Sequence, residues 1–104
     1  MSTRLSGRTF EFEWDDVKAK TNFRKHGVPF QLARTVFSDE RILTVADLEH
    51  SELEDRWISI GCASNGGFLT VVYLWSETST ATKIRLISAR RATQAEIRYY
   101  REGV

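Results

Sequence analysis

The sequence Asn-Gly-Gly at residues 65–67 separates two stretches that alternate between apolar and polar residues. In the first stretch, residues 56–63, Ile58 and Ile60 share one face, and residues 68–75 form the second stretch. This two-residue period is typical of β-strands, and asparagine and glycine readily adopt the positive φ angles of a tight turn. The pattern therefore predicts an antiparallel hairpin at the centre of the chain.

Further alternating stretches at residues 41–46 and 83–89 flank this hairpin and extend it to a meander. Near the N-terminus, Phe10, Phe12 and Trp14 alternate with glutamates, which predicts one more short strand with a buried face. We expect a four- to five-stranded, mainly antiparallel sheet.

Three segments have the start and stop signals of helices. Asp15 or Asp16 can cap a helix that runs to His26 before Gly27, with Val17 and Phe23 expected on its inner side. Pro29 opens a second helix that closes near Ser38, and a capping box of Thr93 and Glu96 begins a third that runs to about Arg101. Two helices, a meander and a final helix predict an α+β fold.

Length and composition limit the classes of function. With 104 residues and 41% hydrophobic residues, we expect a flexible tail over residues 1–9 and one domain over residues 10–104, with at most a shallow surface cleft. The longest apolar stretch, residues 68–75, is far shorter than the roughly 20 residues that span a bilayer, so we expect a cytoplasmic protein with no membrane contact.

The motifs of common cofactor sites are missing from the sequence. Cys62 is the single cysteine, which excludes an internal disulfide, and His26 and His50 lie 24 residues apart without a metal-binding pattern. The sequence has no GxSxG, no phosphate-binding glycine loop and no GxGxxG after a strand. We therefore expect no cofactor and no metal.

Charge is unevenly distributed although the net charge is only +1. Residues 37–55 hold seven acids and one base, whereas residues 83–101 hold six bases and one acid. Eleven of the fifteen basic residues are arginines. Guanidinium groups bind phosphate or carboxylate with two parallel hydrogen bonds, but an arginine-rich composition alone produces the same bias.

Three groups of polar residues could carry chemistry. Lys25 and His26 end the first predicted helix, where a cation also fits as a simple helix cap. His50 and Glu54 precede Arg56 in a segment that can equally be a solvated acidic loop, with Glu54 orienting Arg56.

The third group is Arg85 with Arg90 and Arg91. Alternation places Arg85 on the face opposite to Ile84, Leu86 and Ser88, and Arg90 and Arg91 fall between the strand end and the last helix. Backbone N–H groups at a helix start and two guanidiniums would form a phosphate-binding corner. Alternatively, Arg90 and Arg91 pair with the acidic loop.

At these positions the sequence resembles the BrnT family, the toxin half of bacterial type II toxin–antitoxin pairs, over about residues 10–103. The resemblance rests on Phe12-Glu13-Trp14-Asp15, Asn22 to Gly27, Phe30 to Phe37 before Asp39, His50-Ser51-Glu52 with Glu54 and Arg56, and Ile87 to Ala92 before Glu96 and Tyr99. It implies a RelE-like fold and a metal-independent endoribonuclease that arrests growth. It also implies a BrnA-type ribbon-helix-helix antitoxin, through which alone the pair would bind promoter DNA.

RNA cleavage without a metal needs a base for the 2′-hydroxyl, cations for the phosphorane-like charge and an acid for the leaving group. We expect phosphate binding and charge stabilisation from Arg56, Arg85, Arg90 and Arg91. Proton transfer would fall to His26 or His50 with Lys25, and Glu54 is the reserve base. We expect the antitoxin to dock on these arginines, with Tyr99 and Tyr100 as apolar anchors.

Two alternatives use the same residues. In one, the chain is a non-catalytic RNA- or protein-binding module whose arginine-rich face holds an acidic partner. In the other, it is a structural subunit with Tyr99 and Tyr100 as contacts.

Overall fold

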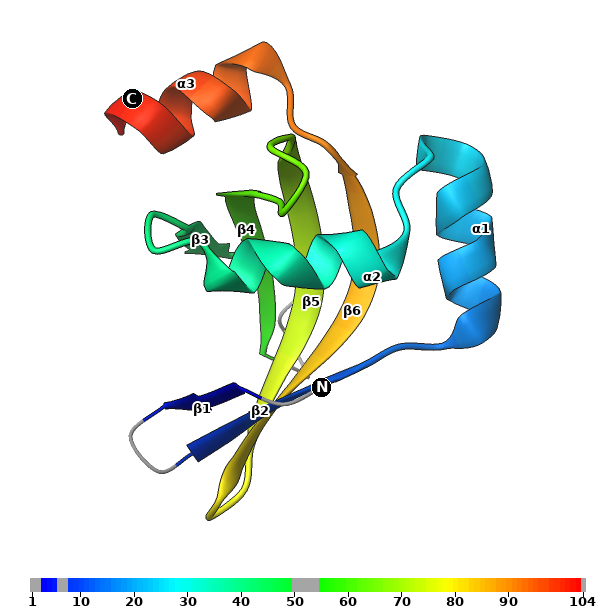
Figure 1. Ribbon diagram of the computed structural model, residues 1–104, viewed down its shortest axis with the longest axis vertical. Coiled ribbons are helices and arrows are strands. Elements are labelled where there is room, and N and C mark those ends of the chain that lie inside the picture. Colours follow the sequence, from blue (N-terminus) through cyan, green and yellow to red (C-terminus); the bar gives the residue numbers. More distant parts are fainter. Residues whose placement is uncertain (1–2, 6–7, 50–54, 104) are drawn as a thin grey trace.

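The computed structural model describes residues 3–5, 8–49 and 55–103, which form one mixed sheet, three α-helices and one 3₁₀ helix (Figure 1). The elements are β1 (Thr3–Leu5), β2 (Arg8–Glu13), α1 (Asp16–His26), α2 (Phe30–Ala33), the 3₁₀ helix η1 (Arg34–Ser38), β3 (Leu43–Ala46), β4 (Arg56–Cys62), β5 (Phe68–Glu77), β6 (Ala81–Arg91) and α3 (Gln94–Glu102). The strand order of the six-stranded sheet is β1-β2-β6-β5-β4-β3. The α+β class is as predicted.

The predicted antiparallel meander is present, but the sheet as a whole is mixed. Strands β3 to β6 pair antiparallel in chain order. Strand β2 pairs parallel to β6, with Phe12 opposite Ile84. Local alternation identifies a strand without giving its partner, and β2 and β6 are separated along the chain by the helices and the rest of the meander.

The N-terminal residues differ from the predicted tail. Thr3–Leu5 forms β1, which pairs antiparallel with β2, and β2 begins at Arg8 rather than at Phe10. The described sheet therefore has more strands than the four or five predicted. A three-residue strand is too short for alternation to reveal it.

Helix α1 has the predicted ends but a different inner face. The Asp15 carboxylate accepts hydrogen bonds from Val17 N and Lys18 N, and Gly27 closes the helix with φ 70°. Val17 and Phe23 were expected to be buried, yet they are 72% and 54% exposed. Asn22 points inward instead, because its amide bonds the backbone of the sheet.

Asn22 fixes α1 to β6. Its Nδ2 donates to Ala89 O at 2.9 Å and to Val28 O at 3.2 Å, and its Oδ1 accepts from Ala89 N at 3.1 Å. The side chain is buried at 6% exposure. Polar Asn22 thus attaches α1 to the sheet, the role that the apolar pattern predicted for Phe23.

The second predicted helix is split into the short α2 and the 3₁₀ helix η1. Thr35 Oγ1 donates to Leu32 O at 2.6 Å, which competes with regular helical bonding at the junction. Phe30, Ala33 and Val36 of this segment are buried against the sheet. At Gly61 of β4 a Cβ atom would lie 3.0 Å from Val36 Cβ, so the close approach of η1 to the sheet favours glycine there.

The two faces of the sheet differ in what covers them. The helix face packs against α1, α2 and η1 and carries Val71, Tyr73 and Leu86. The distal face is the opposite one, and it carries Arg85 and Leu74 because neighbouring residues of a strand point to opposite sides. Helix α3 lies at one end of the sheet (Figure 1).

A β-bulge in β6 changes the predicted faces. Tyr73 pairs with Leu86 whereas Val72 pairs with Ser88, so the strand contains one extra residue. Ser88 therefore lies on the distal face with Arg85, contrary to simple alternation. Arg90 and Arg91 lie within β6, opposite Thr70 and Leu69, rather than after the strand.

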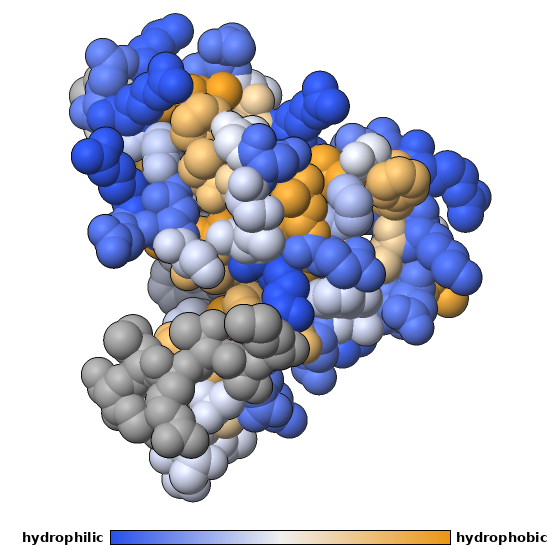
Figure 2. All heavy atoms as spheres, viewed as in Figure 1, coloured by the Kyte–Doolittle hydropathy of each residue, from blue (hydrophilic) through white to orange (hydrophobic). Residues whose placement is uncertain are grey.

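In Figure 2 hydrophobic side chains gather between the hydrophilic margins that α1 and α3 form on this side of the molecule. No helix in the described part of the chain combines the length and the apolar character needed to cross a bilayer.

Candidate functional site

Arg56 and Arg85 lie in one cross-strand row on the distal face. Leu74 of β5 is the register partner of Arg56 on one side and of Arg85 on the other, and Glu13 of β2 continues the row. Neighbouring strands are about 4.8 Å apart, so the two arginine backbones are separated by roughly 10 Å. This row brings together two of the predicted site residues from distant parts of the chain.

The two arginines are held to different degrees. Arg56 Nε lies 3.5 Å from Asp47 Oδ2, and the two side chains are only 28% and 13% exposed. Arg85 Nη1 lies 3.7 Å from Glu13 Oε1, with side-chain exposures of 40% and 50%. Exposed ion pairs of this kind contribute less than about 1 kcal/mol, so the Arg85 guanidinium can exchange Glu13 for another anion.

Arg90 forms a salt bridge with Glu96 of α3, and its side chain is 41% exposed. Its guanidinium donates to both carboxylate oxygens of Glu96, at 2.8 and 2.9 Å. The same carboxylate accepts from Thr70 Oγ1 and from Thr93 N in the predicted capping box. These hydrogen bonds, chiefly the one from Arg90, lower the pKa of Glu96 to about 2. The carboxylate that Arg90 contacts thus belongs to α3 rather than to the acidic loop, and the role of Arg90 in phosphate binding stays a prediction.

Lys25, His26 and Arg91 lie on the other side of the sheet from Arg56 and Arg85. Arg91 is two residues beyond Ala89 in β6, on the helix face, and Lys25 and His26 end the helix that Asn22 attaches to Ala89. Lys25, His26 and Arg91 are exposed. The predicted cations therefore divide into two groups on opposite faces instead of forming one surface.

Two of the predicted proton-transfer residues, His50 and Glu54, lie outside the described residues. They belong to the segment between β3 and β4 that ends one residue before Arg56.

Asp39 forms a hydrogen-bonded cluster that the sequence pattern did not indicate. Its carboxylate accepts from Tyr100 OH at 2.6 Å, from Cys62 N at 2.8 Å and from Arg41 N at 2.9 Å. Partial burial opposes ionisation, but the hydrogen bonds outweigh it and hold the pKa of Asp39 below its usual value. The hydrogen bond to Asp39 raises the pKa of Tyr100 to about 12.

Tyr100 is therefore half-buried and hydrogen-bonded within the fold, and is not the free contact that we expected. Its ring also packs edge-on against Phe68, with centroids 5.4 Å apart. Tyr99 is 42% exposed and remains accessible. Sequence spacing could not distinguish the two adjacent tyrosines, because Asp39 lies 61 residues away along the chain.

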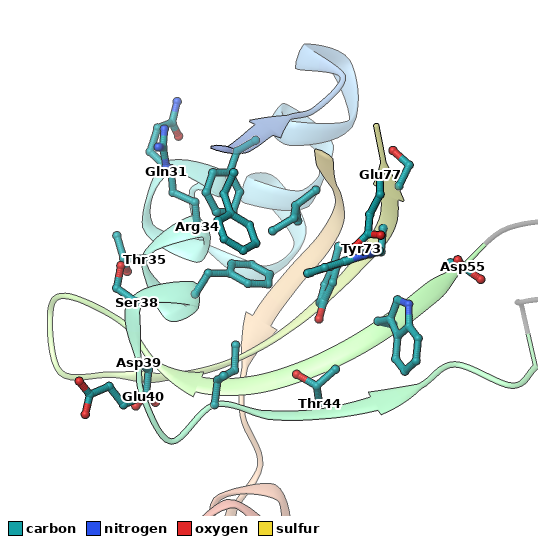
Figure 3. A pocket seen from close by; sticks show the side chains of 18 residues that line it. Gln31, Arg34, Thr35, Ser38, Asp39, Glu40, Thr44, Asp55, Tyr73 and Glu77 are labelled. Carbon is teal, nitrogen blue, oxygen red and sulfur yellow. Dashed lines mark hydrogen bonds between the residues drawn. The ribbon is translucent and has the colours of Figure 1, made fainter. Parts of the chain in front are cut away.

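A hollow of about 1410 Å³ lies on the helix face, beside α2 and η1 (Figure 3). We call it the aromatic groove; six aromatic residues line it, namely Phe10, Phe12, Phe37, Trp57, Tyr73 and Trp75. The charged residues at the groove are Arg34, Asp39, Glu40, Asp55 and Glu77. The alternation of Phe10 and Phe12 predicted a buried strand face and did not indicate a groove.

Among the described residues, no group of three or more histidine, cysteine, aspartate or glutamate side chains is arranged to hold a metal ion.

A family model described as "Ribonuclease toxin, BrnT, of type II toxin-antitoxin system" matches residues 14–96. The crystal structure of the Brucella abortus ribonuclease toxin BrnT is similar, with a TM-score of 0.59 and 25% sequence identity over 83% of this chain and 100% of that chain. No curated protein matches significantly. The match over most of the chain confirms the resemblance, and the chain belongs to the BrnT family of ribonuclease toxins of type II toxin–antitoxin systems.

Proposed function

We propose that the chain is an endoribonuclease that cleaves RNA by metal-independent transesterification, with the phosphate bound on the distal face. The observation that carries this proposal is the cross-strand row of Arg56, Leu74 and Arg85. The backbones of the two arginines are about 10 Å apart, and their side chains are long enough for both guanidiniums to contact one phosphate. Family membership supports ribonuclease activity in general.

RNA supplies its own nucleophile, the 2′-hydroxyl, so the protein has to move two protons and stabilise the charge that develops on the phosphate. Arg85 is the phosphate-binding residue in this proposal, because its pairing with Glu13 is solvent-exposed and exchangeable. Arg56 stabilises developing charge, because Asp47 orients its guanidinium.

For proton transfer we propose His50 or Glu54, since the segment that contains them leads directly into Arg56. A second candidate surface for anion binding consists of Lys25, His26 and Arg91. It is favoured by the position of α1 beside the end of β6. Only one of the two sets can contact a given phosphate, because the sheet separates them.

The partner implied by a type II system is an antitoxin. We propose that it is a BrnA-type ribbon-helix-helix protein encoded beside this chain, that promoter DNA is bound only through it, and that the toxin acts on RNA in the bacterial cytoplasm. The order of two helices, meander and last helix also supports the proposed relation to RelE-like ribonucleases.

The test is incubation of purified protein with bulk RNA in EDTA, followed by analysis of the new ends. Transesterification leaves 2′,3′-cyclic phosphates and 5′-hydroxyls. A strict requirement for Mg²⁺, or 3′-hydroxyl products, would reject the mechanism. Because some relatives of this fold class could need the ribosome, translating extracts are the second substrate, and growth arrest on induced expression is the readout in cells.

A further inference from the structure

The aromatic groove is a preformed surface. Phe37 packs at 5.3 Å from Phe12 and 4.9 Å from Tyr73, and Phe10 packs edge-on against Trp75 at 6.2 Å between ring centroids. These contacts fix the orientation of the rings, so a ligand would not have to order them. Most of the rings keep partial solvent exposure although they pack against the core.

The groove is distinct from the proposed catalytic row. Trp57 and Tyr73 are register partners on the helix face, whereas Arg56 and Leu74, one residue away in each strand, point to the distal face. The sheet itself separates the two surfaces. The groove therefore has no assigned role in RNA cleavage.

The charges at the groove select against nucleic acid. Among the described residues that line it there are four carboxylates and one guanidinium, that of Arg34. The Arg34 guanidinium lies over the Phe12 ring, 4.9 Å from its centroid. Asp55 and Glu77 lie across the groove from Arg34 (Figure 3). A phosphate backbone would be repelled, but lysine or arginine side chains would be attracted.

The size of the groove favours a polypeptide. Small-molecule pockets typically have volumes of about 300–1,000 Å³ and enclose most of the ligand. The groove is larger, at about 1410 Å³, and lies open at the surface. Apolar anchors on one side of a helix or extended segment, flanked by basic residues, match a groove of this shape and charge.

We propose that the aromatic groove binds a segment of the antitoxin that carries apolar side chains flanked by lysine or arginine. This proposal rests on one part of the proposed function, namely that this toxin has an antitoxin. It replaces the expectation that the antitoxin docks on the arginines, since those arginines are divided between two faces and Tyr100 is bonded to Asp39.

A second copy of this chain offers similar chemistry and is the main competitor. The exposed face of α1 carries Val17 and Phe23 together with Lys18, Lys20 and Arg24. Insertion of α1 into the groove of another copy would be a head-to-tail contact that need not close, and would produce growing assemblies. Light scattering of the toxin without antitoxin detects that outcome, which would overturn the proposal.

The experiment measures the affinity of the toxin for the product of the adjacent reading frame. Two variants alter the groove: Glu40→Lys/Asp55→Lys reverses two exposed charges, and Ser38→Trp places a ring in it. The control, Glu49→Lys/Glu102→Lys, reverses two exposed charges that do not line the groove. Thermal melting of every variant verifies that the protein is folded.

We expect both groove variants to weaken binding at least about tenfold, as loss of interface anchors does, and the control and Arg85→Ala to bind like the wild type. Wild-type affinity of both folded groove variants, or failure of the wild type to bind, would overturn the proposal. Should Ser38→Trp unfold, the double charge reversal decides alone. RNA cleavage by the free wild type is measured separately. If the wild type did not cleave RNA, the affinities of the variants for the antitoxin would still test the groove.

Discussion

Arg56 and Arg85 are 29 positions apart in the chain, yet both lie beside Leu74, one on each neighbouring strand. The relationship follows from the register of the β4–β5 and β5–β6 pairs, which places all three side chains on the distal face. A phosphate that contacted both guanidiniums would sit over the Leu74 side chain.

Glu13 competes with RNA for Arg85. Its carboxylate lies 3.7 Å from the Arg85 guanidinium, and an exposed pair of this type is worth less than about 1 kcal/mol. Glu13→Gln should therefore raise the affinity for single-stranded RNA about two- to fivefold at low salt, with Glu102→Gln as the control. Equal effects of the two substitutions in fluorescence anisotropy would show that only net charge matters.

Asn22 should matter more to stability than the larger Phe23 beside it. Asn22→Ala leaves the buried Ala89 N–H and C=O without their side-chain partner, which costs about 2–3 kcal/mol of unfolding free energy. Phe23 is 54% exposed, so Phe23→Ala should change that free energy by less than about 0.5 kcal/mol. Urea denaturation of the two variants tests this, and the reverse order would mean that α1 is attached by its apolar residues.

Glu96 makes the folded state sensitive to acid. Its pKa is about 2 in the folded protein against 4.5 unperturbed, chiefly because Arg90 donates to it. A carboxylate with a depressed folded pKa stabilises the fold above its unfolded pKa, and this contribution is lost as pH falls from about 5 towards 2. Glu96→Gln should flatten the decline of melting temperature over that range.

The matched control for this pH effect is Glu102→Gln, which removes an exposed carboxylate of the same helix. It should melt with the pH profile of the wild type. A wild-type profile for Glu96→Gln as well would assign the acid sensitivity to other carboxylates, with Asp39 next to be tested because hydrogen bonds also hold its pKa low.

Local patterns sufficed for much of the fold. The turn at residues 65–67, the cap at Gly27 and the capping box of Thr93 and Glu96 were all predictable, because each depends on residues close together in sequence. The parallel pairing of β2 with β6 was not, since it depends on where a strand lies after the whole chain has folded. The bulge after Leu86 likewise reversed the predicted face of Ser88.

The candidate site was predictable as a list of residue types and only partly as an arrangement. Their positions along the predicted strands and the family resemblance identified Arg56, Arg85, Arg90 and Arg91, but partners distant in sequence decide what each contacts. Arg90 pairs with Glu96, and the bulge and the strand extension place Arg91 on the face opposite to Arg85. The aromatic groove was hidden because rings that line a groove and rings that fill a core have the same periodicity.

The most direct test of the account compares initial rates of RNA cleavage in EDTA for two single variants, Arg85→Ala and His26→Ala. Both residues carry side chains at the surface, on opposite sides of the sheet. We expect Arg85→Ala to lower the cleavage rate about 10²-fold or more, the scale of one preorganised charge donor, and His26→Ala to stay within about fivefold of the wild type. The opposite order, with both variants folded, would move catalysis to the end of α1 and contradict the distal-face mechanism.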